Sequence, residues 1–424
     1  MNPLLRAIPS LLLLVFAASG CGRAAKPFLK ANGNDLRNDR GKGAVVLLRG
    51  VNLGGWLLHE PWMSPMDKSG LLDDHSSREI LDRRFGREVR DSLIAAYQDA
   101  YITTWDLDLI AAAGFNVIRL PFWYRTLQEE DGTWRPDAFA RMDWLVDNAW
   151  ARGIYTVLDL HGAPGGQSDG EATGRVRRKD KTGLVPDFWD NEAQLRRTVG
   201  IWERVAAHYK GNPAVAAYDL INEPMGAPGR EKIWEAYHRL YTAVRAVDPD
   251  HVISVEVCWS GRVEGRDIGW CWEILPRPEH FGWANMLYQL HNYEWDWNNL
   301  DKQIRSTDHM VNEWESHRAW GVPCFIGEFN CMARPEAWNH TLKVYSDHGM
   351  SWALWNYKAT HGTGSDSWGY LNPRKPMPPK PDLQHDSVAE IRRKWSAFSS
   401  RESFEVNPML RAAWEACRLP AKAP

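Results

Sequence analysis

Cysteine is scarce in this chain, and its arrangement argues against a structural metal site. Six cysteines occur among 424 residues, and neither a CxxC pair nor a Cys/His ligand spacing is present. The HExxH spacing of a metalloprotease is also missing. These absences argue against a structural zinc site and against metal-dependent hydrolases of the HExxH type.

The chain also lacks an excess of basic charge and a long apolar run. Its formal net charge is −3, and no basic stripe with interleaved aromatic residues occurs, so we expect no nucleic-acid partner. The apolar stretch 11–18 is too short to span a membrane. Hydrophobic residues make up 44% of the chain and charged residues 25%, a balance that is typical of ordinary globular proteins.

The N-terminus has the features of an export signal. Arg6 supplies positive charge, and the apolar stretch leads through small residues to Cys21. Residues 18–21 resemble a bacterial lipoprotein signal, in which the cysteine becomes the lipidated first residue; a plain secretory peptide is the alternative. We predict a signal peptide over 1–20, lipidation at Cys21, and export to a membrane surface of the bacterial cell envelope, periplasmic or outer, or otherwise secretion. The five other cysteines leave the disulfide pairing open, and the sequence does not indicate the oligomeric state.

Beyond a polar, Gly- and Asn-rich stretch at 22–43, which we predict to be a tether, apolar strand-like runs alternate with amphipathic helical patterns. No linker or low-complexity tract divides residues 44–417 into two domains. The strand-like runs are 44–54, 114–122, 153–162, 215–224, 251–259, 285–294, 322–330 and 351–358. Eight strands that alternate with helices predict an α/β fold, a single-domain (β/α)8 TIM barrel.

Polar side chains gather where these predicted strands end, which is where barrels of this type place their chemistry. The residues at the ends are Arg119, Asp159, His161, Asn222, Glu223, His291, Tyr293, Glu328 and Trp355. Two of them, Glu223 and Glu328, form a pair of carboxylates on the fourth and seventh strands. Two facing carboxylates are the apparatus of glycoside hydrolysis, in which one donates a proton and the other stays ionised.

The other residues at the strand ends have expected supporting roles. We expect Asn222 to reach the sugar 2-hydroxyl. Arg119 and Tyr293 are expected to hydrogen-bond the carboxylate of Glu328. The remaining three are expected to contact the sugar, with Trp355 as the floor and with His161 and His291 as donors to hydroxyl groups.

Seven stretches in this order resemble glycoside hydrolase family 5. They are RGVNLGGWL, GFNVIRLPF, DLHGAPGGQ, DLINEP, HNYEW, FIGEFN and WALWNYK, and they extend from about residue 44 to beyond residue 358. The resemblance implies a TIM-type barrel without a metal or cofactor, and retention of configuration. It also implies Glu223 as acid/base, Glu328 as nucleophile, and a supporting shell of Arg119, His161, Asn222, His291, Tyr293 and Trp355.

The substrate is less sharply defined by the sequence. The stretch RGVNLGGWLLHEPW resembles family members that act on β-1,3-glucans, including exo-acting ones, in which a Glu at the place of Glu60 contacts the terminal sugar. We therefore expect a β-glucan or a related carbohydrate as the partner. The long loops 168–190 and 361–382 are expected to wall off one end of the cleft and to favour short or exo-type cleavage.

Several alternatives remain open at this stage. Within the hydrolases, the substrate could be β-mannan, cellulose or a glycolipid glycoside, and transglycosylation shares the same covalent intermediate. A non-catalytic carbohydrate-binding surface protein would use the same aromatic residues but should lack one of the two carboxylates. The 24 tryptophans fit core packing first and sugar stacking second.

Overall fold

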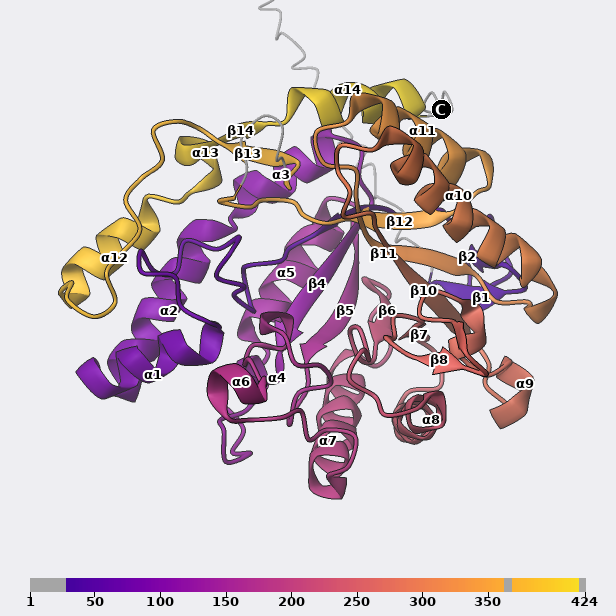
Figure 1. The fold of residues 1–424 in the computed structure, drawn as a ribbon, viewed down its shortest axis with the longest axis horizontal. Helices are drawn as coiled ribbons and strands as arrows, with labels where there is room; N and C mark the ends of the chain where they lie inside the picture. Colours follow the sequence, from indigo (N-terminus) through magenta and orange to yellow (C-terminus); the bar gives the residue numbers. More distant parts are fainter. Residues whose placement is uncertain (1–27, 362–367, 419–424) are drawn as a thin grey trace, which may run out of the picture.

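The computed structural model describes residues 28–361 and 368–418, and at its centre eight parallel strands close into a barrel (Figure 1). Around the barrel the strands are β3 (Arg49–Asn52), β4 (Val117–Trp123), β5 (Tyr155–Gly162), β6 (Val215–Asp219), β7 (Val252–Glu256), β10 (Met286–Tyr293), β11 (Cys324–Asn330) and β12 (Ser351–Leu354). Each predicted strand-like run coincides with one of them. The structure therefore confirms the (β/α)8 barrel.

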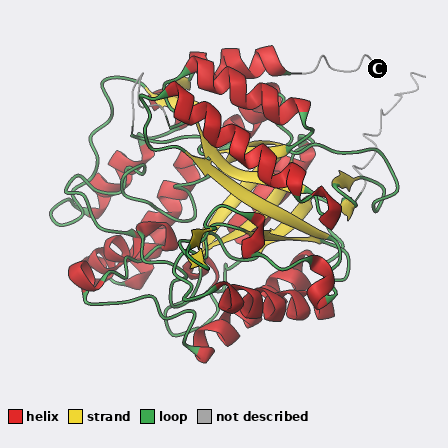
Figure 2. Cartoon of the chain, turned by 45° about the vertical axis from the view of Figure 1, so that its right-hand side comes forward, coloured by secondary structure: helices red, strands yellow, loops and turns green. Residues whose placement is uncertain are grey.

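Helices surround the barrel, as Figure 2 shows. They are α1 (Asp74–Phe85), α2 (Arg87–Tyr101), α3 (Thr104–Ala112), α4 (Tyr124–Leu127), α5 (Ala140–Ala151), α6 (Lys179–Thr182), α7 (Glu192–Tyr209), α8 (Arg230–Val247), α9 (Pro278–Phe281), α10 (Leu300–Ser316), α11 (Pro335–Asp347), α12 (Val388–Ser396), α13 (Ser400–Ser403) and α14 (Pro408–Cys417). Short 3-10 turns occur at η1 (Glu171–Thr173), η2 (Trp272–Ile274) and η3 (Arg318–Trp320). Two small antiparallel pairs join β8 (Arg262–Val263) to β9 (Arg266–Asp267), and β13 (Leu371–Pro373) to β14 (Phe404–Val406).

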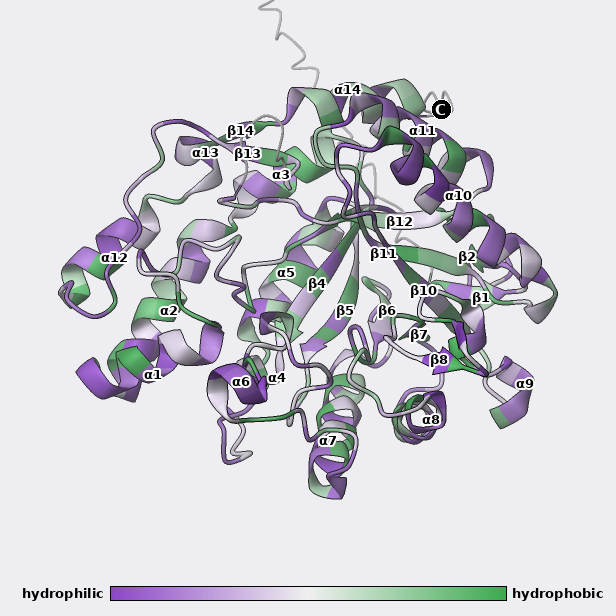
Figure 3. Ribbon diagram, in the orientation of Figure 1, coloured by the Kyte–Doolittle hydropathy of each residue, from purple (hydrophilic) through white to green (hydrophobic). Residues whose placement is uncertain are grey.

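Helix α7 illustrates why the outer segments become helices. Trp202, Val205 and Tyr209 recur at steps of three and four residues along its sequence, and all three are buried. The Asn191 side chain accepts a hydrogen bond from the first turn and so caps the helix. Helices α7 and α8 carry hydrophilic and hydrophobic residues on different sides (Figure 3), which is the pattern of a helix packed on a core.

The segment 22–43, which we predicted to be a tether, is folded from residue 28 onward. Strands β1 (Lys30–Asn32) and β2 (Asp35–Arg37) form an antiparallel hairpin. Leu29 and Leu36 are buried in one cluster with Val117, Val252 and Phe325, which lie at the beginnings of their strands. The hairpin thus closes the end of the barrel opposite to the strand ends, because two leucines fill its base.

Other sequence expectations concern the cysteines and the N-terminus. Cys258, Cys271, Cys324, Cys331 and Cys417 carry free thiols, so the described part of the chain contains no disulfide. The predicted signal peptide and Cys21 lie outside the described residues. Among the helices of residues 28–361 and 368–418, none has the length and apolar character needed to cross a membrane.

Candidate active site

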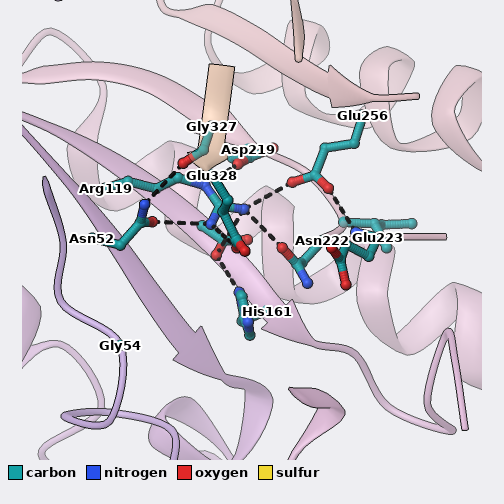
Figure 4. Close-up of polar contacts among 12 residues, drawn as sticks. Asn52, Gly54, Arg119, His161, Asp219, Asn222, Glu223, Glu256, Gly327 and Glu328 are labelled. Carbon is teal, nitrogen blue, oxygen red and sulfur yellow. Dashed lines mark hydrogen bonds and ion pairs between the residues drawn. The ribbon is translucent and has the colours of Figure 1, made fainter. Parts of the chain in front are cut away.

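Arg119 on β4 is the centre of a buried polar network inside the barrel (Figure 4). Its side chain is fully buried, and its three nitrogens together contact six oxygen acceptors. These acceptors belong to Asn52, Asp159, Asp219, Asn222, Glu256 and Glu328, at distances of 2.8 to 3.1 Å. Burial alone would lower the pKa of Arg119, but the surrounding carboxylates raise it well above its ordinary value. The guanidinium is therefore a permanent cation in the site.

Glu328 on β11 is held by two donors, as the sequence predicted. Arg119 Nη1 donates to Glu328 Oε1 at 2.8 Å, and the Tyr293 hydroxyl donates to Oε2 at 2.8 Å. Hydrogen bonds that involve an ionised partner are short and strong. The cation and the hydroxyl together hold this carboxylate in place and fix its orientation.

Glu223, just after β6, has a different environment. Its Oε1 lies 2.9 Å from Nδ1 of His291, and its backbone N–H donates to Glu256 Oε2 at 2.7 Å. Burial raises its pKa, while His291 keeps a pKa of about 4 because burial lowers it. A neutral ring next to a buried carboxyl favours retention of the proton on Glu223 near neutral pH.

The two carboxylates converge on the same histidine nitrogen. His291 Nδ1 lies 2.9 Å from Glu223 Oε1 and 3.6 Å from Glu328 Oε2. These two oxygens can therefore be no farther apart than the two distances together. This limit on one pair of oxygens is compatible with the separation of about 5–5.5 Å between the carboxyl groups of retaining glycosidases.

A cavity of about 430 Å³ opens over the pair. Six tryptophans line it, namely Trp62, Trp270, Trp295, Trp297, Trp355 and Trp368, together with Glu171, Ala172, Met225 and His361. Both long loops contribute to this wall, through Glu171 and Ala172 from 168–190 and through His361 and Trp368 from 361–382. The cavity thus combines flat apolar faces with two carboxylates, the composition of a carbohydrate site.

Six of the nine predicted site residues line this cavity: Glu60, His161, Glu223, Tyr293, Glu328 and Trp355. His161 stacks on Trp355 with ring centroids 5.3 Å apart, and its Nδ1 lies 2.6 Å from Asp159 Oδ2. Glu60 accepts a hydrogen bond from the Trp62 indole at 2.8 Å. Burial raises the pKa of Glu60 to about 8, so its side chain is neutral at pH 7.

The other three predicted residues lie behind the lining. Arg119 was expected there, because its role is to hold Glu328. Asn222 and His291 are both buried and are not among the residues that line the cavity, and their contacts with sugar hydroxyls stay a prediction. The carbonyl oxygen of Asn222 accepts from Arg119, and His291 contacts Glu223. Both side chains support the two catalytic candidates from beneath.

Three residues of the network were not singled out from the sequence: Asn52, Asp219 and Glu256. Each lies at the last position of a barrel strand, at the ends of β3, β6 and β7. A polar residue that closes an otherwise apolar run, such as Glu256 after VISV, is the signal that would have revealed them.

No ion is needed to explain the buried carboxylates. Oxygens of Asp159, Asp219 and Glu256 lie within 4.8 Å of one another, but the Arg119 guanidinium already lies against all three. A second group, Glu223, Cys258 and His291, is equally close together. Burial and the nearby carboxylates raise the pKa of the Cys258 thiol well above its ordinary value, so it is a poor metal ligand. A third group, Cys271, His309 and Glu313, lies among residues that do not line the cavity.

Comparison with known proteins agrees with this geometry. A family model described as Cellulase (glycosyl hydrolase family 5) matches residues 84–361. A β-xylosidase from Phanerodontia chrysosporium is 27% identical over 363 residues, which cover 78% of this chain and 71% of that protein. A probable glucan 1,3-beta-glucosidase A from Neosartorya fischeri is 28% identical over 288 residues, which cover 63% of this chain and 65% of that protein. The chain thus spans less than two thirds of the length of this glucosidase.

Solved structures show the same fold. An endogalactoceramidase structure aligns with a TM-score of 0.59 at 21% identity and covers 87% of this chain and 84% of that one. Endoglucanase Cel5A from Thermotoga maritima aligns with a TM-score of 0.52 at 18% identity and covers 87% and 96%. The family model spans most of the chain, and the barrel presents two carboxylates to one cavity: the chain belongs to glycoside hydrolase family 5 and is a glycosidase.

Proposed function

We propose that this glycosidase cleaves β-glucosidic bonds of a β-glucan or a derived oligosaccharide by double displacement. Glu223 serves as acid/base and Glu328 as nucleophile. The observation that carries this proposal is the convergence of the two carboxylates on His291 Nδ1, at 2.9 and 3.6 Å, while their other partners differ. Glu328 contacts the guanidinium of Arg119 and the hydroxyl of Tyr293, whereas Glu223 contacts the neutral ring of His291.

The two environments separate the two roles in the way that the chemistry requires. Arg119 and Tyr293 hold the two oxygens of Glu328 and orient this carboxylate for attack on the anomeric carbon. Burial raises the pKa of Glu223, so that this residue keeps the proton that the leaving oxygen must receive.

The reaction then has two steps. Glu328 forms a bond to the anomeric carbon as the glycosidic bond breaks, and the proton of Glu223 passes to the departing oxygen. In the second step Glu223 takes a proton from water, the water oxygen attacks the anomeric carbon, and the ester bond to Glu328 breaks. Two inversions give net retention.

The tryptophan-lined cavity and the relatives support a glucoside substrate. Trp355 lies beside the carboxylates as a platform for a sugar ring. Glu60, neutral at pH 7, can both donate to and accept from a sugar hydroxyl. Relatives of this chain include probable glucan 1,3-beta-glucosidases, which favours an exo-acting enzyme on β-1,3-linked glucose. The loop residues Glu171 and Trp368 contribute to the wall that would shorten the cleft.

A substrate panel with product analysis tests the proposal. Laminarin-type and cellulose-type glucans, β-mannan, xylo-oligosaccharides, glycolipids and aryl β-glycosides are incubated with the enzyme, and the products are identified. We expect the highest kcat/KM with β-glucans and glucose as the first product, which NMR should detect initially as the β-anomer. Mixed internal fragments would contradict exo action, and an initial α-anomer would contradict double displacement.

A trapping reagent tests the assignment of the nucleophile. A 2-deoxy-2-fluoro-β-glycoside with a good leaving group should accumulate as a covalent glycosyl-enzyme. Mass spectrometry of the digested protein should find the label on the peptide that contains Glu328. A label on another residue would refute the assignment.

We also propose that the protein is exported and lipidated at Cys21. This proposal rests on the sequence of residues 1–21. Metabolic labelling with a fatty acid should mark the wild-type protein in the membrane fraction of a bacterial host and should not mark Cys21→Ser. Equal labelling of both proteins would refute it.

A further inference from the structure

Glu256 is a buried carboxyl group in direct contact with the site that the proposed reaction does not use. It is the last residue of β7, and its side chain is fully buried. Its Oε1 accepts from Arg119 Nη2 at 2.8 Å and from the amide of Gln289. Its Oε2 accepts from the backbone N–H of Glu223 at 2.7 Å. Figure 4 shows Glu256 between the guanidinium and the backbone of Glu223.

The charges around Arg119 require at least one bound proton. Four buried carboxyl groups, those of Asp159, Asp219, Glu256 and Glu328, contact the single guanidinium. Four anions next to one cation, three of them with fully buried side chains, would be strongly unfavourable. Burial, and then the charge of Asp219, raise the pKa of Glu256 well above its ordinary value, and burial likewise raises the pKa of Asp159. Of these two groups, only Glu256 lies against His291. A proton on Glu256 lies on Oε2, because Oε1 already accepts two hydrogen bonds.

The oxygen that carries this proton faces His291. Nε2 of His291 is buried and lacks a hydrogen-bond partner among the described residues. The Glu256 Oε2 atom lies 3.5 Å from it. Hydrogen bonds of this kind are often long in an empty site and shorten in the substrate complex. The other ring nitrogen, Nδ1, lies 2.9 Å from Glu223 Oε1.

We propose that Glu256 is a positioning residue for the acid/base: its neutral carboxyl donates to His291 Nε2 and accepts from the backbone of Glu223. The inference deepens the proposed function and rests on the role of Glu223 as acid/base. With Nε2 accepting a hydrogen bond from the Glu256 carboxyl, the hydrogen of the neutral ring must lie on Nδ1. Nδ1–H then donates to Glu223 Oε1, which leaves Glu223 Oε2 to carry the catalytic proton toward the leaving group.

The same arrangement serves both steps of the reaction. When Glu223 loses its proton, its carboxylate still accepts from Nδ1–H, and no group of the chain has to change its tautomer. An ionised Glu256 would instead draw the ring hydrogen to Nε2 and would remove the donor from Glu223. The backbone contact matters as well, because Glu223 has a φ of 37°, in the left-handed region that side chains other than glycine rarely adopt.

The titration of Glu256 depends on every charged or titratable group packed against it. These groups are Arg119 from β4, Asp159 from β5, Asp219 from β6, Glu223 from the loop after β6, Tyr237 from α8, Cys258 after β7, His291 from β10 and Glu328 from β11. Only Arg119 among them is cationic at neutral pH, since burial lowers the pKa of His291 to about 4.

Kinetics with two leaving groups test this role. In Glu256→Gln the amide keeps a donor for His291 but loses the acceptor for Glu223 N–H, and Glu256→Leu loses both. For an aryl β-glycoside with a poor leaving group, which needs protonation, we expect kcat/KM to fall on the order of tenfold in Glu256→Gln and about 100-fold in Glu256→Leu. The dinitrophenyl glycoside, which needs no proton, should stay within about threefold in both variants.

Asp219→Asn provides a matched control, because Asp219 contacts the same Arg119 and Gln289 but neither Glu223 nor His291. We expect its losses to be equal for the two leaving groups. The same pattern in the two Glu256 variants would show that they merely disturb Arg119, and would overturn the inference.

A measurement on the wild-type protein does not depend on whether a variant folds. Nitrogen NMR of the protein labelled with 15N-histidine, with His291→Asn to assign the signal, should show a neutral ring at pH 7 with its hydrogen on Nδ1. A hydrogen on Nε2, or a charged ring, would overturn the inference.

A rescue experiment with azide distinguishes a failure of this inference from a failure of the proposed function. If azide does not restore turnover of the dinitrophenyl glycoside by Glu223→Ala, then the acid/base role of Glu223 itself is wrong. If azide does restore turnover, and the Glu256 variants behave like Asp219→Asn, only the role of Glu256 is wrong.

Discussion

Trp295 is an exposed aromatic side chain at the edge of the catalytic cavity, and its replacement tests whether the cavity binds sugar rings by stacking. The side chain is 64% exposed and lines the cavity. It stacks on Tyr293 with centroids 5.6 Å apart, and the Tyr293 hydroxyl donates to Glu328. A sugar unit of the substrate that lies beyond the two carboxylates along this wall would contact the free face of Trp295. We therefore predict that Trp295→Ala weakens substrate binding.

The expected loss follows from the surface that a sugar would cover. A tryptophan side chain has about 250 Å² of surface, and a sugar on its one open face would cover roughly a third of this, about 80 Å². At about 25 cal/mol per Å² this burial is worth about 2 kcal/mol. Since about 1.4 kcal/mol corresponds to a tenfold change in affinity, KM should rise about 25-fold.

Steady-state kinetics on the preferred oligosaccharide measure this effect. Stacking at the edge contributes equally to the bound substrate and to the transition state, so KM should rise while kcat stays nearly constant. Trp105→Ala is the matched control. Trp105 is also exposed, at 37%, but it lies on α3 and does not line the cavity. We expect wild-type constants for this control.

Two results would refute the reasoning. A KM within about twofold of the wild type in Trp295→Ala would show that this face contributes little to binding, far less than the area predicts. A fall in kcat without a rise in KM would show that Trp295 acts through Tyr293 on the nucleophile rather than on the sugar.

Four further predictions concern catalysis and stability. Glu328→Ala should lower kcat by at least about 10⁴-fold for all substrates, because the covalent step is lost; turnover near the wild-type rate would exclude the nucleophile role. Glu60 keeps its proton in the folded protein up to a pH of about 8, whereas the unfolded chain loses this proton near the ordinary pKa of a glutamate. The wild type should therefore lose stability as pH rises through this range, and Glu60→Gln should not. Equal slopes of Tm against pH in the two proteins would contradict the burial effect. Dialysis against EDTA should leave kcat/KM unchanged, since Arg119 supplies the cation; a loss that a divalent metal restores would contradict this. Leu36→Ala should cost about 2–5 kcal/mol in unfolding free energy without changing kcat, because Leu36 fills the base of the barrel; an unchanged Tm would contradict the packing.

The sequence was most informative where a strand ends in a chemically distinctive residue. Arg119, Glu223 and Glu328 were predicted from their positions alone, and the structure brings all three into one network. Strands of a parallel barrel are buried on both faces, so their apolar pattern does not show which side chains point inward. The structure supplies that information through the register, in which Gln289 pairs with Glu256 and His291 pairs with Glu328.

Two other features of the structure could not be predicted from the sequence, each for a different physical reason. The β1–β2 hairpin has strands of three residues, too short for a periodic pattern, and it is held by the contacts of Leu29 and Leu36 with distant strands. The place of His291 behind Glu223, rather than in the cavity, depends on side-chain depth, which strand order does not determine.

The β1–β2 hairpin and the catalytic cavity lie at opposite ends of the barrel. The described chain starts at Phe28, beside the hairpin, and the catalytic mouth is at the far end of the strands. An attachment upstream of this point would therefore hold the enzyme at the end of the barrel opposite to the catalytic cavity. The cavity would then face away from the attachment point and be accessible to glycan chains in solution.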